Sequence, residues 1–132
     1  QKGGTSNIVD VLDYGDVITK HGLNLLNGPG NDIVAVTNLT ACGVHMILFT
    51  TGRGTPVGAP VPTVKIATNS RLFDKKPHWM DFNAGTLLEG EDMQNAANRL
   101  FDFCIGVANG RLTRNEENGY REISIFKDGV TL

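Results

Sequence analysis

The sequence contains no long hydrophobic run. Its longest apolar stretches, of which Met46–Phe49 is one, are far shorter than the ~20 residues that a membrane-spanning helix needs. No apolar signal-peptide core follows the polar start Gln1–Gly4. An excess of one charge is also missing, because the net charge is −2 and the basic residues are scattered, with Lys75-Lys76 the densest pair. We therefore expect a cytoplasmic protein that uses neither a membrane nor a nucleic acid as its partner.

Cysteine is scarce, and no short catalytic motif is present. Cys42 and Cys104 both lie in apolar, helix-like patterns. A disulfide between them is one alternative, but two reduced core thiols suit this composition better. Cys42-x-x-His45 has the spacing of metal ligands but offers only two of them, so it is a weak metal site. A nucleophile elbow, an HExxH sequence, a pair of CxxC motifs and a P-loop are all absent, so no motif names a reaction.

What is present suits one folded domain over residues 1–132. A chain of this length buries most of its apolar surface around a single core. Apolar residues make up 40% and charged residues 20%, and the mean hydropathy is −0.13, which excludes a disordered or membrane-embedded chain. The chain starts without methionine, and its Gly-Gly beginning resembles an internal loop, so we expect a piece of a longer protein.

Periodicity predicts alternating strands and helices. The expected strands are Gly22–Asn27, Val44–Thr51, Thr63–Thr68 and Glu122–Phe126. The expected helices run from Asn31-Asp32 to about Cys42, from Asn69-Ser70 to Pro77, and over Glu91–Asn109. The first helix is rich in β-branched residues, so a strand remains its alternative. The apolar stripe of the last helix comprises Met93, Ala96, Ala97, Leu100, Cys104 and Val107. This order predicts a three-layer α/β/α domain with a largely parallel, Rossmann-like sheet.

The loop that follows Thr51 is the first place to look for a ligand, because ligands of such sheets bind where strands end. Gly52 and Gly54 flank Arg53 and let a ligand approach the backbone closely. The guanidinium of Arg53 suits a carboxylate, and the hydroxyls of Thr51 and Thr55 suit a polyol. The glycine spacing does not match the dinucleotide fingerprint. We favour a ligand loop over a tight turn with a solvated arginine.

Three further positions are weaker candidates. Asn31 follows Gly28-Pro29-Gly30 at a helix start, where free amides attract anions, although a simple helix cap explains it equally well. Lys65 lies mid-strand; an exposed lysine is the commoner case there, but a buried one has a pKa low enough for proton transfer. His45 alternates with its neighbours and is expected to be a hydrogen-bonded core histidine rather than a catalytic one. Asp81, Asn83 and Gly85 form a polar loop that could face the same crevice.

The longest motifs resemble a known family. Five stretches, in order, are similar to the C-terminal region of the altronate/galactarate dehydratase family: Pro29–Asp32, Leu48–Pro56, Val61–Ser70, Trp79–Gly85 and Arg121–Leu132. This resemblance implies dehydration of a C6 sugar acid to a 2-keto-3-deoxy acid, with a divalent metal, typically Fe2+ (Mn2+ or Mg2+ are alternatives), whose ligands it does not identify. It also implies N-terminal and middle domains that this chain lacks, with Leu132 as the natural end of the enzyme.

On this resemblance we assign expected roles by residue chemistry. Lys65 is the candidate base or enediolate stabiliser, and His45 is an outside candidate for acid or base. The expected substrate-binding residues are Arg53 for the carboxylate and, for hydroxyls and backbone contacts, Thr51, Gly52, Gly54, Thr55, Asn69 and Asn31. The isolated chain is then expected to be inactive. Two alternatives stay open: a non-catalytic domain for assembly or oligomerisation, and a relative that eliminates from another acid such as sulfolactate.

Overall fold

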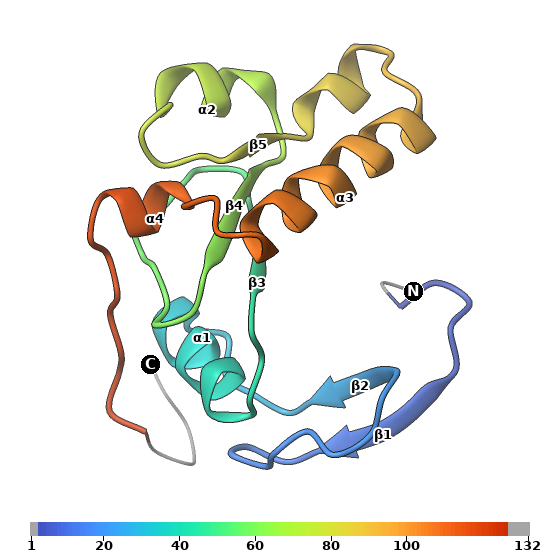
Figure 1. Ribbon diagram of the computed structural model, residues 1–132, viewed down its shortest axis with the longest axis vertical. Helices are drawn as coiled ribbons and strands as arrows, with labels where there is room; N and C mark the ends of the chain where they lie inside the picture. The colour runs from blue at the N-terminus through green and yellow to red at the C-terminus, as the bar shows by residue number, and fades with distance from the viewer. Residues whose placement is uncertain (1–2, 127–132) are drawn as a thin grey trace.

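The computed structural model describes residues 3–126; the expectations for Gln1 and for Leu132 lie outside this range. Five strands and four helices follow one another along the chain, together with a short 3-10 helix, η1 (Figure 1). The strands are β1 (Ile8–Leu12), β2 (Leu23–Leu26), β3 (Ile47–Thr51), β4 (Thr63–Ala67) and β5 (Phe82–Asn83). The helices are α1 (Asp32–Ala41), α2 (Ser70–Lys75), η1 (Gly85–Glu89), α3 (Met93–Ala108) and α4 (Arg114–Glu117).

Every strand pair is parallel, which confirms the predicted α/β class. β3, β4 and β5 form one sheet with β4 in the middle, while β1 and β2 form a separate pair. All five residues of β4 are buried, as expected for the central strand of a parallel sheet that is covered on both faces.

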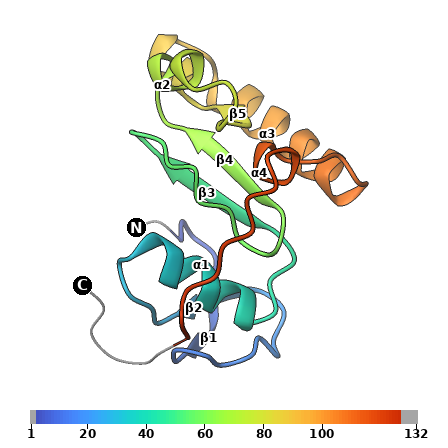
Figure 2. The same cartoon turned by 90° about the vertical axis from the view of Figure 1, so that its left-hand side faces the viewer.

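Helices cover the two faces of the larger sheet (Figure 2). On one face Val36 of α1 packs with Ile47 of β3 and Ala59. On the other face Val107 of α3 packs with Val64 and Ile66 of β4 and with Phe82 of β5. Because β3 and β4 both end at the same edge of the sheet, the loops after Thr51 and Ala67 lie side by side there.

The segment after Asn31 is a helix, so its strand alternative is excluded. Gly43 follows it with φ of 95°, a conformation that favours glycine and turns the chain toward β3. Both cysteines are free thiols, as predicted, with Cys42 buried and Cys104 half-buried. Within residues 3–126 no helix is long and apolar enough to cross a membrane.

Three sequence-based expectations are wrong. Glu122–Phe126 is extended but forms no strand, because its backbone binds loop and side-chain groups instead: the Glu122 amide donates to the carbonyl of Gly58, and the Ser124 amide donates to the hydroxyl of Thr37. Its isoleucines face outward, with Ile125 87% exposed. In α3, Met93 and Ala97 are exposed and the buried residues are Ala96 and Val107, so only part of the predicted stripe is core.

His45 is the third correction. It is exposed rather than in the core, because the turn at Gly43 delays the start of β3 to Ile47 and leaves His45 outside the sheet. The elements that the sequence analysis did not predict are β1, β5, η1 and α4.

Candidate functional site

The loop that follows β3 is held by side chains from the neighbouring strand and helix. The side-chain amide of Asn69 donates to the carbonyl of Gly52 (3.2 Å), and the ammonium of Lys76 donates to the carbonyl of Arg53 (2.9 Å). The ammonium of Lys65 donates to the carbonyl of Thr55 (2.5 Å). Three backbone carbonyls of the loop are thus fixed by charged or amide donors. Because the bond at Arg53 is made to its backbone carbonyl, its guanidinium stays available for a ligand.

The turn itself depends on Thr51 and Gly54. The hydroxyl oxygen of Thr51 accepts from the amide of Gly54 at 3.0 Å. Gly54 has φ of 79°, and a Cβ there would meet Leu72 Cδ1 at 2.9 Å. Glycine is therefore favoured at this position by its backbone conformation, and the Leu72 side chain of α2 would have to shift to admit a larger residue.

A pocket of about 380 Å3 opens beside this loop, at the carboxyl ends of β3 and β4. Its basic side chains come from the loop, from α2 and from the residue after α2, and its lining contains no acidic residue: Gly52, Arg53, Asn69, Arg71, Leu72, Lys75 and Lys76. Four cations around one small cavity make a site suited to an anion. We call it the basic pocket.

Sequence reasoning placed three of these residues in a site and missed Arg71, Lys75 and Lys76. The two lysines had been noted only as a pair of adjacent charges. Arg53 lies far from them in the sequence, and the parallel pairing of β3 with β4 brings the two segments together. The sequence feature that could have identified these residues is the helix start at Asn69-Ser70. The helix that begins there places its basic side chains beside the loop after β3.

The predicted hydroxyl ligands are largely occupied by structural contacts. Asn69 caps α2 by accepting from the amide of Leu72 (2.9 Å) while its amide binds Gly52. The Thr55 hydroxyl accepts from the amide of Val57 at 3.3 Å. These residues shape the loop, and Arg53 remains the side chain with the clearest opportunity to bind a substrate.

Lys65 is fully buried, at 0% exposure, so the commoner case of an exposed strand lysine is wrong for this chain. The face of β4 that carries it is covered, and its ammonium lies 5.2 Å from the centre of the Phe49 ring. Burial lowers the pKa of Lys65 to about 8, against the opposing effect of the Asp81 carboxylate. The ammonium of Lys65 therefore supports the loop through its hydrogen bond to Thr55, and Lys65 does not line the basic pocket.

The depressed pKa of Lys65 predicts a specific dependence of stability on pH. Between about pH 8 and the ordinary lysine pKa, the unfolded chain keeps a proton that the folded chain has lost, so the free energy of unfolding rises with pH in this window. The difference between the ordinary lysine pKa of 10.5 and the folded-state pKa of about 8 corresponds to a full rise in the free energy of unfolding of about 3 kcal/mol. In Lys65→Met this contribution is absent. Denaturant titrations of both 132-residue chains from pH 7 to 10.5 test it; parallel curves would contradict it.

Neither His45 nor Asn31 lines the basic pocket. His45 precedes β3 whereas Arg53 follows it, and the 5 residues of the strand span roughly 16 Å. Asn31 occupies the N-cap position of α1, but its side chain makes no capping hydrogen bond. The length of β3 therefore separates His45 from Arg53, while the role of Asn31 stays a prediction.

The polar loop around β5 contacts both neighbouring elements. The carboxylate of Asp81 accepts from the amides of Lys65 and Arg114, each at 2.8 Å. The side chain of Asn83 donates to the hydroxyl of Ser70 at the start of α2 (3.0 Å) and accepts from the amide of Gly85 (2.8 Å). This loop thus fixes the helix that carries the basic side chains.

The described residues do not form a divalent-metal site. Among residues 3–126 no group of three or more His, Cys, Asp or Glu side chains is placed to hold an ion. The basic pocket has a lining of arginine and lysine, which is the opposite of the oxygen-rich donor set that such a cation needs. A metal would need ligands from outside this range.

Fold and site define an α/β domain with a basic pocket at the carboxyl ends of its parallel strands. A family model described as D-galactarate/Altronate dehydratase, C-terminal, matches residues 1–131, and the chain belongs to this family. Altronate dehydratases of Escherichia coli (strain K12) and Bacillus subtilis (strain 168) are 55% and 52% identical to it, over 100% of this chain and 27% of each relative. Galactarate dehydratase (L-threo-forming) of Escherichia coli (strain K12) is 42% identical over 83% of the chain and 21% of that protein. The chain spans about a quarter of the length of these relatives.

Proposed function

We propose that this chain forms the C-terminal part of a cytoplasmic hydro-lyase that dehydrates a C6 sugar acid, altronate or galactarate, to a 2-keto-3-deoxy acid. Family membership supports the reaction class, and the names of the relatives support the two substrates. The observation that carries a direct role for this chain is the basic pocket, where Arg53 lies among three further cations. In this proposal the N-terminal and middle domains of the enzyme complete the active site.

The chemistry of the reaction explains why concentrated positive charge is useful. Loss of the proton next to the carboxylate gives an enediolate, on which the carboxylate oxygens carry more negative charge than in the substrate. Departure of the β-hydroxyl then leaves an enol that rearranges to the 2-keto-3-deoxy acid. Arg53 binds the substrate carboxylate in a forked contact, and Arg71, Lys75 and Lys76 stabilise the added charge.

The base and the metal are placed outside the basic pocket in this proposal. Lys65 is enclosed beneath the loop, so we propose that it positions Thr55 and the loop; its role as the base stays a prediction that the kinetics of Lys65→Met test. His45 lies at the other end of β3, and its role as acid or base also stays a prediction. The divalent metal expected from the resemblance, Fe2+ or else Mn2+ or Mg2+, is held by other parts of the polypeptide, and no step is assigned to it here.

A second candidate function is a domain that mainly supports assembly. The exposed apolar side chains of α3, with Phe101 65% exposed, favour this alternative. The two candidates differ in what the basic pocket does. If the domain only supports assembly, substitutions in the basic pocket leave turnover unchanged while substitutions on α3 lower it.

The substrate is tested by an activity screen of the full-length protein. Altronate, galactarate and sulfolactate are incubated with the enzyme and Fe2+, and the keto acid or released sulfite is measured. We expect turnover of altronate or galactarate, while the isolated 132-residue chain is inactive. Turnover of sulfolactate alone would reassign the reaction to a related elimination.

A further inference from the structure

The apolar surface of α3 is wider than the part that the sheet covers. Ala96, Leu100, Phe103 and Val107 face or border the sheet. A second stripe, at every fourth position, comprises Met93, Ala97, Phe101 and Ile105; it begins beside the sheet-facing residues and is exposed along its length. Met93, Phe101 and Ile105 are 67%, 65% and 46% exposed. Figures 1 and 2 show α3 at the border of the molecule, with no other helix or strand over its outer side. We call this second stripe the α3 face.

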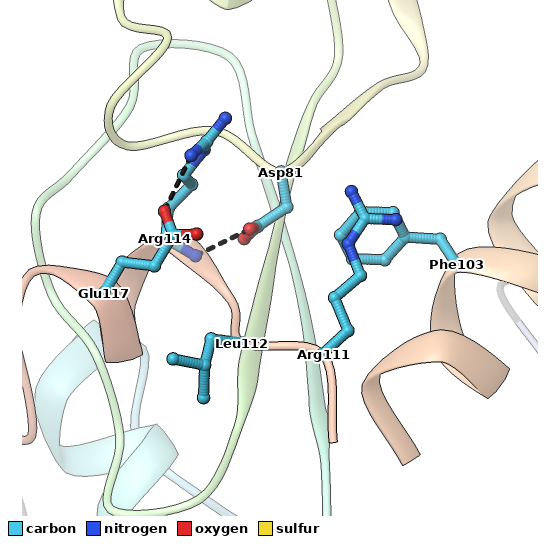
Figure 3. Close-up of a pocket in the computed structure, with 6 residues that line it drawn as sticks. All are labelled: Asp81, Phe103, Arg111, Leu112, Arg114 and Glu117. Atoms are coloured by element: carbon cyan, nitrogen blue, oxygen red, sulfur yellow. Dashed lines mark hydrogen bonds and ion pairs between the residues drawn. The ribbon is translucent and has the colours of Figure 1, made fainter. Parts of the chain in front are cut away.

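A charged groove lies near the C-terminal end of α3, on the flank of the helix that carries Phe103 rather than the α3 face. It has a volume of about 280 Å3 and is lined by Asp81, Phe103, Arg111, Leu112, Arg114 and Glu117 (Figure 3). The guanidinium of Arg111 lies flat on the Phe103 ring, 4.2 Å from its centre. Leu112, next to it, is 55% exposed.

Among the groove charges, Arg111 is the one without a counterpart in the described part of the chain, residues 3–126. The Asp81 carboxylate accepts hydrogen bonds from two backbone amides, and the Arg114 guanidinium forms an ion pair with Glu117 at 2.6 Å. Arg111 has neither an ion pair nor a side-chain hydrogen bond within residues 3–126, although stacking holds its donors in a fixed plane. An arginine presented in this way suits a carboxylate from a partner.

We propose that the α3 face docks an apolar segment of the polypeptide that precedes this chain, and that the Arg111 groove, on the other flank of the helix, binds a carboxylate side chain of the same polypeptide. The family model describes a C-terminal region, and the chain covers 27% of its altronate dehydratase relatives, so most of such a polypeptide lies before it. Exposed apolar side chains and a stacked arginine are both typical of interface centres. The inference rests on family membership and does not require the basic pocket to be catalytic.

Hydroxyl-radical footprinting of the full-length protein tests the docking. Comparing native with denatured protein, we expect Met93, Phe101 and Ile105 to be modified about tenfold more slowly in the native state, as for side chains buried in an interface. Leu88, which is 80% exposed, serves as the internal reference. Equal modification of the α3 face and Leu88 would overturn the proposal. Protection that disappears on dilution would show a second copy as the occupant and would also overturn it.

Two pairs of variants make the test specific. Phe101→Lys is expected to remove the protection at Met93 and Ile105, whereas Asn95→Lys, which adds the same charge on an exposed side of α3 away from the stripe, keeps it. Arg111→Ala is expected to expose Leu112 to modification, whereas Arg121→Ala does not. Arg111 is exposed, so its replacement leaves the fold intact and keeps the test valid if Phe101→Lys does not fold. Unchanged protection in Arg111→Ala contradicts the assigned role of this arginine.

Discussion

Alanine in place of Arg53 is expected to lower kcat/KM of the full-length enzyme for its sugar acid by about 100-fold, because a forked charge contact in the transition state is lost. The stability of the domain is expected to stay unchanged. The loop is held through backbone carbonyls and Thr51, and the Lys76 contact is to the backbone of Arg53 and not to its side chain. Steady-state kinetics together with the thermal midpoint separate these two effects.

Two matched variants sharpen this prediction. Arg121→Ala removes an exposed arginine that does not line the basic pocket, and it is expected to leave kcat/KM within about twofold of wild type. Arg53→Lys keeps the charge but loses the fork, so part of the loss remains. Equal kinetics for Arg53→Ala and Arg121→Ala would remove the basic pocket from the reaction and leave the assembly function as the better account.

Gly85→Ala is expected to have the largest effect on stability. A Cβ at this position would lie within 2.5 Å of the Ser70 amide nitrogen and the Asn69 Cα, which are backbone atoms that no rotamer change can move. The start of η1 would have to separate from the start of α2, at a cost of about 3 kcal/mol. The thermal midpoint of the chain is expected to fall by roughly 10 °C.

Gly85→Ala is also expected to disturb the basic pocket, because the displaced Asn69 caps α2 and donates to the carbonyl of Gly52. A loss of activity is therefore expected in the full-length enzyme as well. Gly30→Ala is the control, since a Cβ at Gly30 meets nothing within 4 Å and its φ lies outside the range that favours glycine. Similar midpoints for the two variants would show that the close packing of Gly85 against α2 is not a constraint.

The sequence predicted the α/β class and the main helices because these depend on local signals. Asn69 and Asp92 are capping residues, and both caps form as their side chains accept from backbone amides. The strand at 122–126 was wrong for a reason that local alternation cannot reveal. Ser124 has a specific partner in the hydroxyl of Thr37 on α1, and this contact turns Ile123 and Ile125 outward.

The site was only partly predictable. Arg53 was identified because a glycine-flanked arginine after a buried strand has an unusual composition. Lys65 was misjudged as exposed because the alternation of β4 indicates which side chains share a face, but not whether a helix and a loop cover that face. The contributions of Arg71 and Lys76 depend on the placement of α2 beside the loop, which is a tertiary feature.

The most direct test of the central claim is a crystal structure of the full-length protein with its sugar acid or the keto-acid product bound. The account predicts the carboxylate in the basic pocket, accepting two hydrogen bonds from the guanidinium of Arg53, with Lys75 or Lys76 close to the same oxygens. A carboxylate bound by other domains, with Arg53 facing solvent in the complete enzyme, would contradict it.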